Sequence, residues 1–74
     1  MIINTDRLRN LRKGKNALQK NLASLLKITD RQYRGYEAGT VDPPTSKLII
    51  LADYFDVSID YLVGRTDNPN SHKQ

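Results

Sequence analysis

The first forty residues alternate between short apolar stripes at helical spacing and polar breaks. A stripe of this kind places its apolar side chains on one face of a helix, such as Leu8 and Leu11 in the first segment. The periodicity predicts three helices, at residues 6–13, 18–26 and 29–37. Thr5 or Asp6 is the expected cap of the first helix.

The third predicted helix has a start signal and a stop signal. The hydroxyl of Thr29 can accept a hydrogen bond from a first-turn amide, and Gly39 can end the helix in a left-handed conformation. In the segment before it, the expected buried stripe consists of Leu22, Ala23, Leu25 and Leu26. Only a few residues therefore connect the second and third helices.

The middle of the chain begins with a break in the helical pattern. Pro43 and Pro44 exclude a helix interior and predict an extended crossing to Thr45, the expected cap of a fourth helix. The buried stripe of that helix is expected to consist of Leu48, Leu51, Ala52 and Phe55, with Ile49 or Ile50 contributing.

A short fifth helix at 59–63 is expected between a Ser58 cap and a Gly64 stop. The residues beyond Arg65 are polar and have no apolar stripe. We therefore predict one all-α domain over residues 1–65 and a flexible tail over residues 66–74.

Length and composition favour a binding module over an enzyme. A 74-residue chain has little room for both a core and a catalytic cleft. There is no cysteine, and the only histidine, His72, lies in the predicted tail, so we expect no catalytic residues, no metal site and no cofactor. The longest apolar stretches are far shorter than the roughly 20 residues of a membrane span. We expect a cytoplasmic protein without a membrane partner.

The net charge of +4 is distributed unevenly. Between residues 7 and 34 the only acid is Asp30, whereas the second half carries mostly acids. The cations of this first half are Arg7, Arg9, Arg12, Lys13, Lys15, Lys20, Lys27, Arg31 and Arg34. Such a basic segment favours binding to a polyanion such as a nucleic acid. A solvated basic face without a partner is the alternative.

The second and third predicted helices form a helix-turn-helix pattern. In such a unit the second helix can lie in the major groove of DNA while the first crosses the backbone. Short helical hairpins also occur in all-helical proteins that never contact DNA. The basic segment falls on these same helices, which favours the DNA-binding interpretation.

The chain resembles the Cro and lambda-repressor-like helix-turn-helix domains, also called the XRE family, over about residues 7–67. The matching stretches are RLRNLR at 7–12, LQKNLASLLKIT at 18–29, YRGYEAG at 33–39, Pro44 and LADYFDVSIDYLVG at 51–64. The resemblance implies a compact five-helix fold and a small bacterial or phage transcriptional regulator. It also implies a recognition helix from Thr29 to Tyr36, with Tyr33 in the core. The groove-side residues would be Asp30, Arg31, Gln32, Arg34 and Gly35.

The residue types suggest what each groove-side residue would contact. Arg31 can donate two hydrogen bonds to guanine, and Gln32 could pair with adenine in the same way. Arg34 would reach a base or a phosphate. Asp30 could accept from a cytosine amine, cap the helix, or orient one of the two arginines.

A second group of residues is expected at the DNA backbone. The family match assigns Gln19 a phosphate contact and a bracing role against the recognition helix, with a plain surface glutamine as the alternative. Helix ends and the loop after the recognition helix lie along the groove edges in this docking mode. The remaining backbone candidates are Lys15, Lys20, Lys27, Thr29 and Thr40.

Four positions depart from the family pattern, and one of them is Ala17, which replaces a larger apolar residue. Leu18 stands where a Ser or Thr cap is usual, and Lys27 stands where a glycine often adopts the left-handed turn. Gly35 is unfavourable inside a helix, yet it could permit close approach to DNA.

The last part of the chain is unusually apolar and suggests a homodimer, at least on DNA. Related domains bind inverted repeats as two-fold dimers. Candidate interface residues are Val57, Ile59, Tyr61 and Val63; the alternative is that such side chains close the monomer core, which we prefer for Phe55 and Leu62. The predicted function is a sequence-specific regulator, a repressor, acting on a palindromic operator in double-stranded DNA. The alternative is an antitoxin or another protein-interaction module whose partner is unknown.

Overall fold

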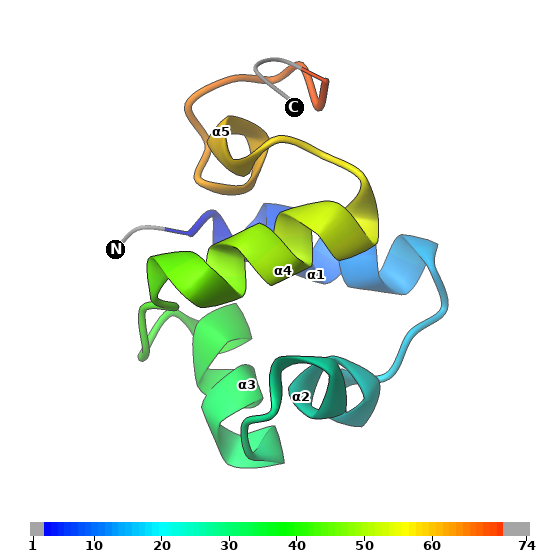
Figure 1. Ribbon diagram of the computed structural model, residues 1–74, viewed down its shortest axis with the longest axis vertical. Helices are drawn as coiled ribbons and strands as arrows, with labels where there is room; N and C mark the ends of the chain where they lie inside the picture. Colours follow the sequence, from blue (N-terminus) through cyan, green and yellow to red (C-terminus); the bar gives the residue numbers. More distant parts are fainter. Residues whose placement is uncertain (1–2, 71–74) are drawn as a thin grey trace.

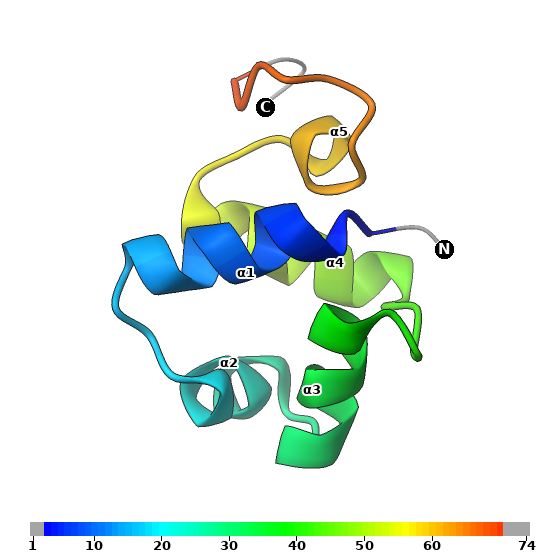
Figure 2. The same cartoon turned by 180° about the vertical axis from the view of Figure 1, so that it is seen from behind.

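The computed structural model describes residues 3–70, which form five helices and no strand. In chain order these are α1 (Thr5–Gly14), α2 (Gln19–Leu26), α3 (Asp30–Ala38), α4 (Thr45–Phe55) and α5 (Ile59–Leu62). Helices α1 and α4 overlap across the middle of the molecule, with α2 and α3 at one end and α5 at the other (Figures 1 and 2). The predicted all-α, five-helix fold is confirmed.

Side chains cap three of the five helices. The hydroxyls of Thr29 and Ser58 accept from Gln32 N and Tyr61 N, as the sequence predicted. Helix α1 is capped instead by Asn4, whose Oδ1 accepts from Arg7 N at 3.0 Å. The expected Thr5 or Asp6 cap was wrong because the helix starts one residue earlier.

The other two starts lack a side-chain cap. Leu18 has no polar atom to offer the first turn of α2, although its own N–H donates to Asn21 Oδ1 at 2.9 Å. Thr45 is the first residue of α4, and Pro44 occupies the cap position. The expected Thr45 cap was therefore wrong: a proline just outside the helix ends the extended crossing without any capping side chain.

Several helices end in the left-handed conformation. Gly39 ends α3 with φ 84°, where a glycine costs nothing, whereas Lys27 and Asp56 adopt φ 59° and 57° with a side chain in place. The left-handed turn expected at Lys27 is confirmed.

The core lies where the apolar stripes of all five helices meet. Its fully buried side chains are Leu8, Leu22, Leu26, Tyr33, Pro43, Leu51 and Leu62. Phe55 is also buried, so Phe55 and Leu62 close the monomer core as preferred from the sequence. Leu25, which was expected in the buried stripe of α2, is 39% exposed. In α4, Ile50 rather than Ile49 packs against the core.

The segment after α5 contacts the helical body through Arg7 of α1. The Arg7 guanidinium donates to Tyr61 O and Thr66 O, pairs with Asp67 at 3.0 Å, and lies 4.0 Å from the centre of the Tyr61 ring. Ser58 N also donates to Pro69 O at 2.7 Å. The flexibility predicted for residues 66–74 stays a prediction, and residues 71–74, with His72, lie outside the described residues.

Within residues 3–70, no helix is long and apolar enough to cross a membrane. Over the same residues, no three of the side chains that commonly ligate metals lie close enough together to hold an ion. The helix-turn-helix region is positioned mainly by the packing of α3 against α1 and α2.

Candidate nucleic-acid interface

Helices α2 and α3 form a helix-turn-helix unit at the end of the molecule opposite α5 (Figures 1 and 2). In the turn, Ile28 N donates to Ala23 O at 3.0 Å beyond the left-handed Lys27. From α4, Lys47 Nζ donates to Leu26 O at 2.8 Å, which places a cation at the C-terminal end of α2. The turn is thus held by its own backbone and by α4.

The exposed side of α3 carries the predicted readout residues Asp30, Arg31, Gln32 and Arg34. Arg31, Gln32 and Arg34 line a surface hollow that continues onto Thr40 and Val41. Tyr33, on the opposite side of α3, is fully buried, as expected. Helical periodicity therefore separates a polar outer face of α3 from its packing face.

The arginines divide by location. Among residues 3–70, the guanidinium groups of Arg31 and Arg34 have no hydrogen-bond or ion-pair partner. The three arginines of α1 all have internal partners: Arg7 as described above, Arg9 at Asp6 and Glu37 O, and Arg12 at Glu37. Thus only part of the basic first half is available to a polyanion, and that part includes α3.

The predicted backbone-contact residues lie at the ends of α2 and α3. Lys20, Lys27, Thr29 and Thr40 are exposed on this side of the fold, at the start of α2, in the turn and just beyond α3. Lys15 is exposed too, but its Nζ lies 5.0 Å from the ring centre of Tyr54, a residue of α4. Their phosphate contacts stay predictions.

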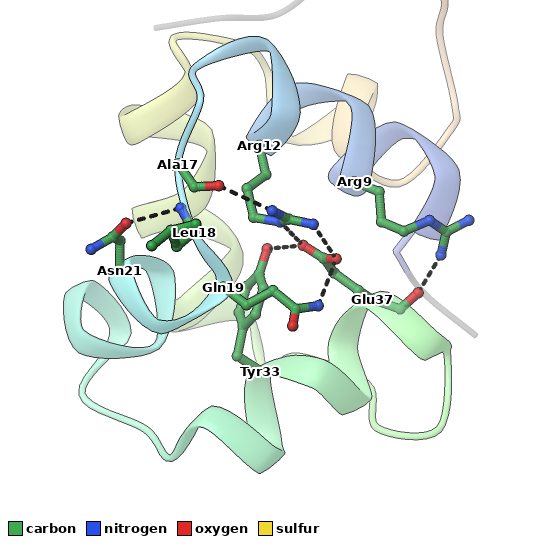
Figure 3. Close-up of polar contacts among 8 residues, drawn as sticks. All are labelled: Arg9, Arg12, Ala17, Leu18, Gln19, Asn21, Tyr33 and Glu37. Carbon is green, nitrogen blue, oxygen red and sulfur yellow. Dashed lines mark hydrogen bonds and ion pairs between the residues drawn. The ribbon is translucent and has the colours of Figure 1, made fainter.

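A buried carboxylate, Glu37, joins α1, α2 and α3 (Figure 3). Its side chain is 3% exposed and accepts four hydrogen bonds: Arg12 Nε (2.6 Å), Arg12 Nη2 (3.2 Å), Gln19 Nε2 (3.1 Å) and Tyr33 Oη (2.7 Å). Arg12 also donates to Ala17 O at 3.0 Å. The bracing part of the role expected for Gln19 is thus visible as a contact with α3.

The hydrogen bonds around Glu37 shift the pKa values of the groups that make them. Burial alone would raise the pKa of Glu37, but the hydrogen bonds from Arg12, Tyr33 and Gln19 outweigh it and lower that pKa. The hydrogen bond to Glu37 in turn raises the pKa of Arg12. The pKa of Tyr33 is raised by burial and by the adjacent carboxylate, so its hydroxyl stays a donor. Around neutral pH, Glu37 is ionised and paired.

Sequence reasoning missed this network, although a signal was present. Arg12 follows Leu8 by four residues and Glu37 follows Tyr33 by four, so each charged residue shares a helix face with a core residue. Charges on core-facing positions are seldom buried unless they are paired. The two positions together therefore indicated an internal ion pair rather than a basic surface.

The structure corrects the placement of Gly35. This residue is buried, and a Cβ built on it would lie 2.7 Å from Val41 Cγ2 and 3.2 Å from Thr40 Oγ1. Close packing against the loop after α3 therefore explains the glycine. Gly35 is buried, yet it lines the same hollow as Arg31, Gln32 and Arg34, and its contact with DNA stays a prediction.

Asp30 neither caps α3 nor pairs with a neighbouring arginine of that helix. Thr29 supplies the side-chain cap of α3, and within residues 3–70 Asp30 makes no ion pair with Arg31 or Arg34. Its carboxylate lies in the first turn, where it favours the helix dipole.

The dimer candidates are spread over different environments. Val57 is 6% exposed and belongs to the core, so its proposal as an interface residue was wrong. Ile59 is 37% exposed, while Tyr61 and Val63 are half-buried and pack against the core. A homodimer through the remaining three residues stays a prediction.

With this geometry established, the chain can be assigned to a class of proteins. Residues 8–62 match the model of the helix-turn-helix family, and the chain belongs to that family. It is a helix-turn-helix domain of the type found in DNA-binding transcriptional regulators.

Individual relatives have the same character. The chain is 47% identical over 64 residues to an uncharacterised HTH-type transcriptional regulator, YobD, of Bacillus subtilis strain 168, covering 86% of this chain and 57% of that protein. It is 38% identical over 60 residues to the cryptic phage CTXphi transcriptional repressor RstR of Vibrio cholerae El Tor Inaba N16961, covering 81% and 54%. A crystal structure of a transcriptional regulator from Listeria innocua superposes with a TM-score of 0.78 at 38% identity, covering 81% and 56%. The chain spans about half the length of these relatives.

Proposed function

We propose that this chain is the DNA-binding part of a sequence-specific transcriptional repressor that inserts α3 into the major groove of a palindromic operator. The observation that carries the proposal is that the guanidinium groups of Arg31 and Arg34, on the exposed face of a capped helix, have no partner within the described residues 3–70. Guanidinium groups without internal partners can donate to base edges without first breaking a hydrogen bond. The repressor role draws support from RstR, which is a phage repressor.

The docking mode follows from the arrangement of the unit. With α3 in the groove, the start of α2 and the turn at Lys27 would approach the phosphates on either side. The hydrogen bond from Gln19 Nε2 to Glu37 Oε1 would hold the Gln19 side chain in place while it contacts a phosphate. A protein acting on bacterial or phage operators in this way works in the cytoplasm.

A two-fold homodimer would place two copies of α3 in successive major grooves. Half-sites about one helical turn apart are the geometric expectation for such a pair. Ile59, Tyr61 and Val63 are the proposed contact residues, because they are the members of the predicted set that the core leaves at least partly exposed. The occupant of that surface is a second copy of the chain.

The test is selection of bound fragments from host DNA at near-physiological salt, followed by sequencing. Enrichment of an inverted repeat supports the dimeric repressor. Enrichment of a single half-site supports sequence-specific binding and refutes the dimer. A pool without enrichment refutes the proposed function and favours a protein partner or non-specific binding.

Two matched variants separate base readout from phosphate attraction. We expect Arg31→Ala to lose about 1–3 kcal/mol of discrimination against the wrong base, because it removes a paired contact. Lys20→Ala should weaken binding to all DNA alike and reduce the salt dependence by about one charge. Equal losses on specific and random DNA for Arg31→Ala would contradict the readout assignment.

A further inference from the structure

The side-chain amide of Gln32 has a bonded oxygen and a nitrogen without a partner among residues 3–70. Thr29 N donates to Gln32 Oε1 at 3.1 Å, while Gln32 N donates to Thr29 Oγ1 at 3.1 Å. These two bonds form the capping box at the start of α3. Within residues 3–70 the Gln32 Nε2 group has no partner. The exposed part of this side chain is therefore a hydrogen-bond donor.

A donor alone cannot make the adenine contact expected from the residue type. Reading adenine requires the amide oxygen to accept from the N6 amine while the amide nitrogen donates to N7. In Gln32 that oxygen is held against the N-terminal end of α3. Oε1 also accepts from Thr29 Oγ1 at 3.5 Å, so both of its lone pairs are used, and making the adenine pair would displace one of these two bonds.

Guanine presents the complementary pattern. Its major-groove edge carries two neighbouring acceptors, N7 and O6, and no donor. A glutamine that keeps its cap can donate from Nε2 to N7, with O6 as a second acceptor beside it. On adenine the same donor would meet one acceptor beside a second donor.

The neighbouring side chains have the same polarity. Arg31, Gln32 and Arg34 line one hollow, and both arginines can only donate. The other carboxylate of α3, Glu37, is buried, and Asp30 does not line this hollow. The long polar side chains that α3 contributes to the hollow are therefore donors, and Arg31, Gln32 and Arg34 together are called the donor surface. The rest of the lining consists of Gly35, Ala38, Thr40 and Val41.

We infer that this donor surface selects half-sites in which guanines, not adenines, face the start of α3, and that Gln32 is a specificity-determining donor locked by the capping box. The inference rests on the proposed DNA-binding function and adds the chemical class of base edge that is read. Its direct consequence is that removing the Gln32 donor, while keeping its acceptor, should abolish discrimination at one guanine.

The chain offers a variant with that property and a matched control. Gln32→Glu keeps an oxygen that accepts from Thr29 N and removes the donor, because glutamate also serves at this capping-box position. Asn21→Asp makes the same chemical change at the equivalent position of α2, where Asn21 Oδ1 accepts from Leu18 N. Each variant adds one negative charge near DNA, so the pair separates lost readout from general repulsion.

The measurement is the dissociation constant, by fluorescence anisotropy at fixed salt, on the duplex recovered by selection. Each guanine is replaced in turn by 7-deazaguanine, and each adenine by purine, which lacks the 6-amino group. The ratio of substituted to intact duplex is taken within each protein, so general electrostatic weakening cancels. Thermal melts of each variant verify that the helices are retained.

We expect wild type and Asn21→Asp to bind about tenfold more weakly at one 7-deazaguanine position, within the range of a single base contact. Gln32→Glu should show a ratio near one at that position. If a purine substitution weakens wild type but not Gln32→Glu, then Gln32 reads adenine and the inference is overturned. It is also overturned if wild type and Gln32→Glu share the same ratios throughout. If wild type binds the selected and random duplexes equally, the proposed function itself fails.

Discussion

Replacing Glu37 by glutamine would test how much the buried ion pair stabilises the fold. Four donors from three side chains converge on this carboxylate, and Arg12, whose side chain is 13% exposed, has no other carboxylate partner among the described residues. Glutamine keeps one accepting oxygen but removes the charge and points an NH₂ group at donors. Arg12 is then left charged and poorly compensated in a largely buried place.

The expected loss is large for a domain of this size. Removing one partner of a buried pair costs about 3–5 kcal/mol, and the remaining exposure of Arg12 favours the lower end. Total stabilities of small domains begin at about 5 kcal/mol. A loss of about 3 kcal/mol would lower the Tm by roughly 12–24 °C, since each kcal/mol shifts the Tm of such a domain by about 4–8 °C.

The assay is urea and thermal unfolding followed by far-UV circular dichroism. Arg12→Gln, Glu37→Gln and the double variant form a double-mutant cycle, in which the double variant should cost less than the sum of the single changes. Asp6→Asn is the matched control, because it breaks the exposed Arg9–Asp6 pair and should leave the midpoint near wild type. A Glu37→Gln variant within about 1 kcal/mol of wild type, or strictly additive single changes, would refute the reasoning.

The remaining predictions concern pH and two local features. Because the folded state lowers the pKa of Glu37 below its ordinary 4.5, its contribution to the unfolding free energy is complete above that value and disappears as the pH falls through the folded pKa. The wild type should therefore lose more stability than Glu37→Gln in urea titrations from pH 5 downward; parallel curves would contradict this. Gly35→Ala should lower the Tm despite its better helix propensity, because the new Cβ lies 2.7 Å from Val41 Cγ2, and adding Val41→Ala should restore part of the loss. Leu18→Ser should stabilise the chain by less than about 1 kcal/mol in the same melts, because the serine hydroxyl would offer a side-chain acceptor to Asn21 N, which already donates to Leu18 O at 3.0 Å; an unchanged Tm would show that α2 gains nothing from a cap.

Local features of the sequence determined the helices. The start of α3 at a Thr29 cap, its end at Gly39 and the left-handed turn at Lys27 follow from interactions among residues three to five apart. The capping box was also readable, since Thr29 and Gln32 have its spacing, but the residue type alone suggested adenine readout. The caps at Asn4 and Pro44 were missed because neighbouring residues offered equally good local signals.

Tertiary structure decided which of the predicted residues are free. Arg12 and Glu37 are 25 positions apart, and only the packing of α1 against α3 brings them into an ion pair. The sequence left open why a glycine stands at position 35 inside a helix, and the tertiary structure answers this because the loop at Val41 packs against it. Val57 was apolar in either setting, and its burial depended on where α4 and α5 meet. A local pattern specifies what a side chain can do, but its partners come from chain segments that only the folded core brings together.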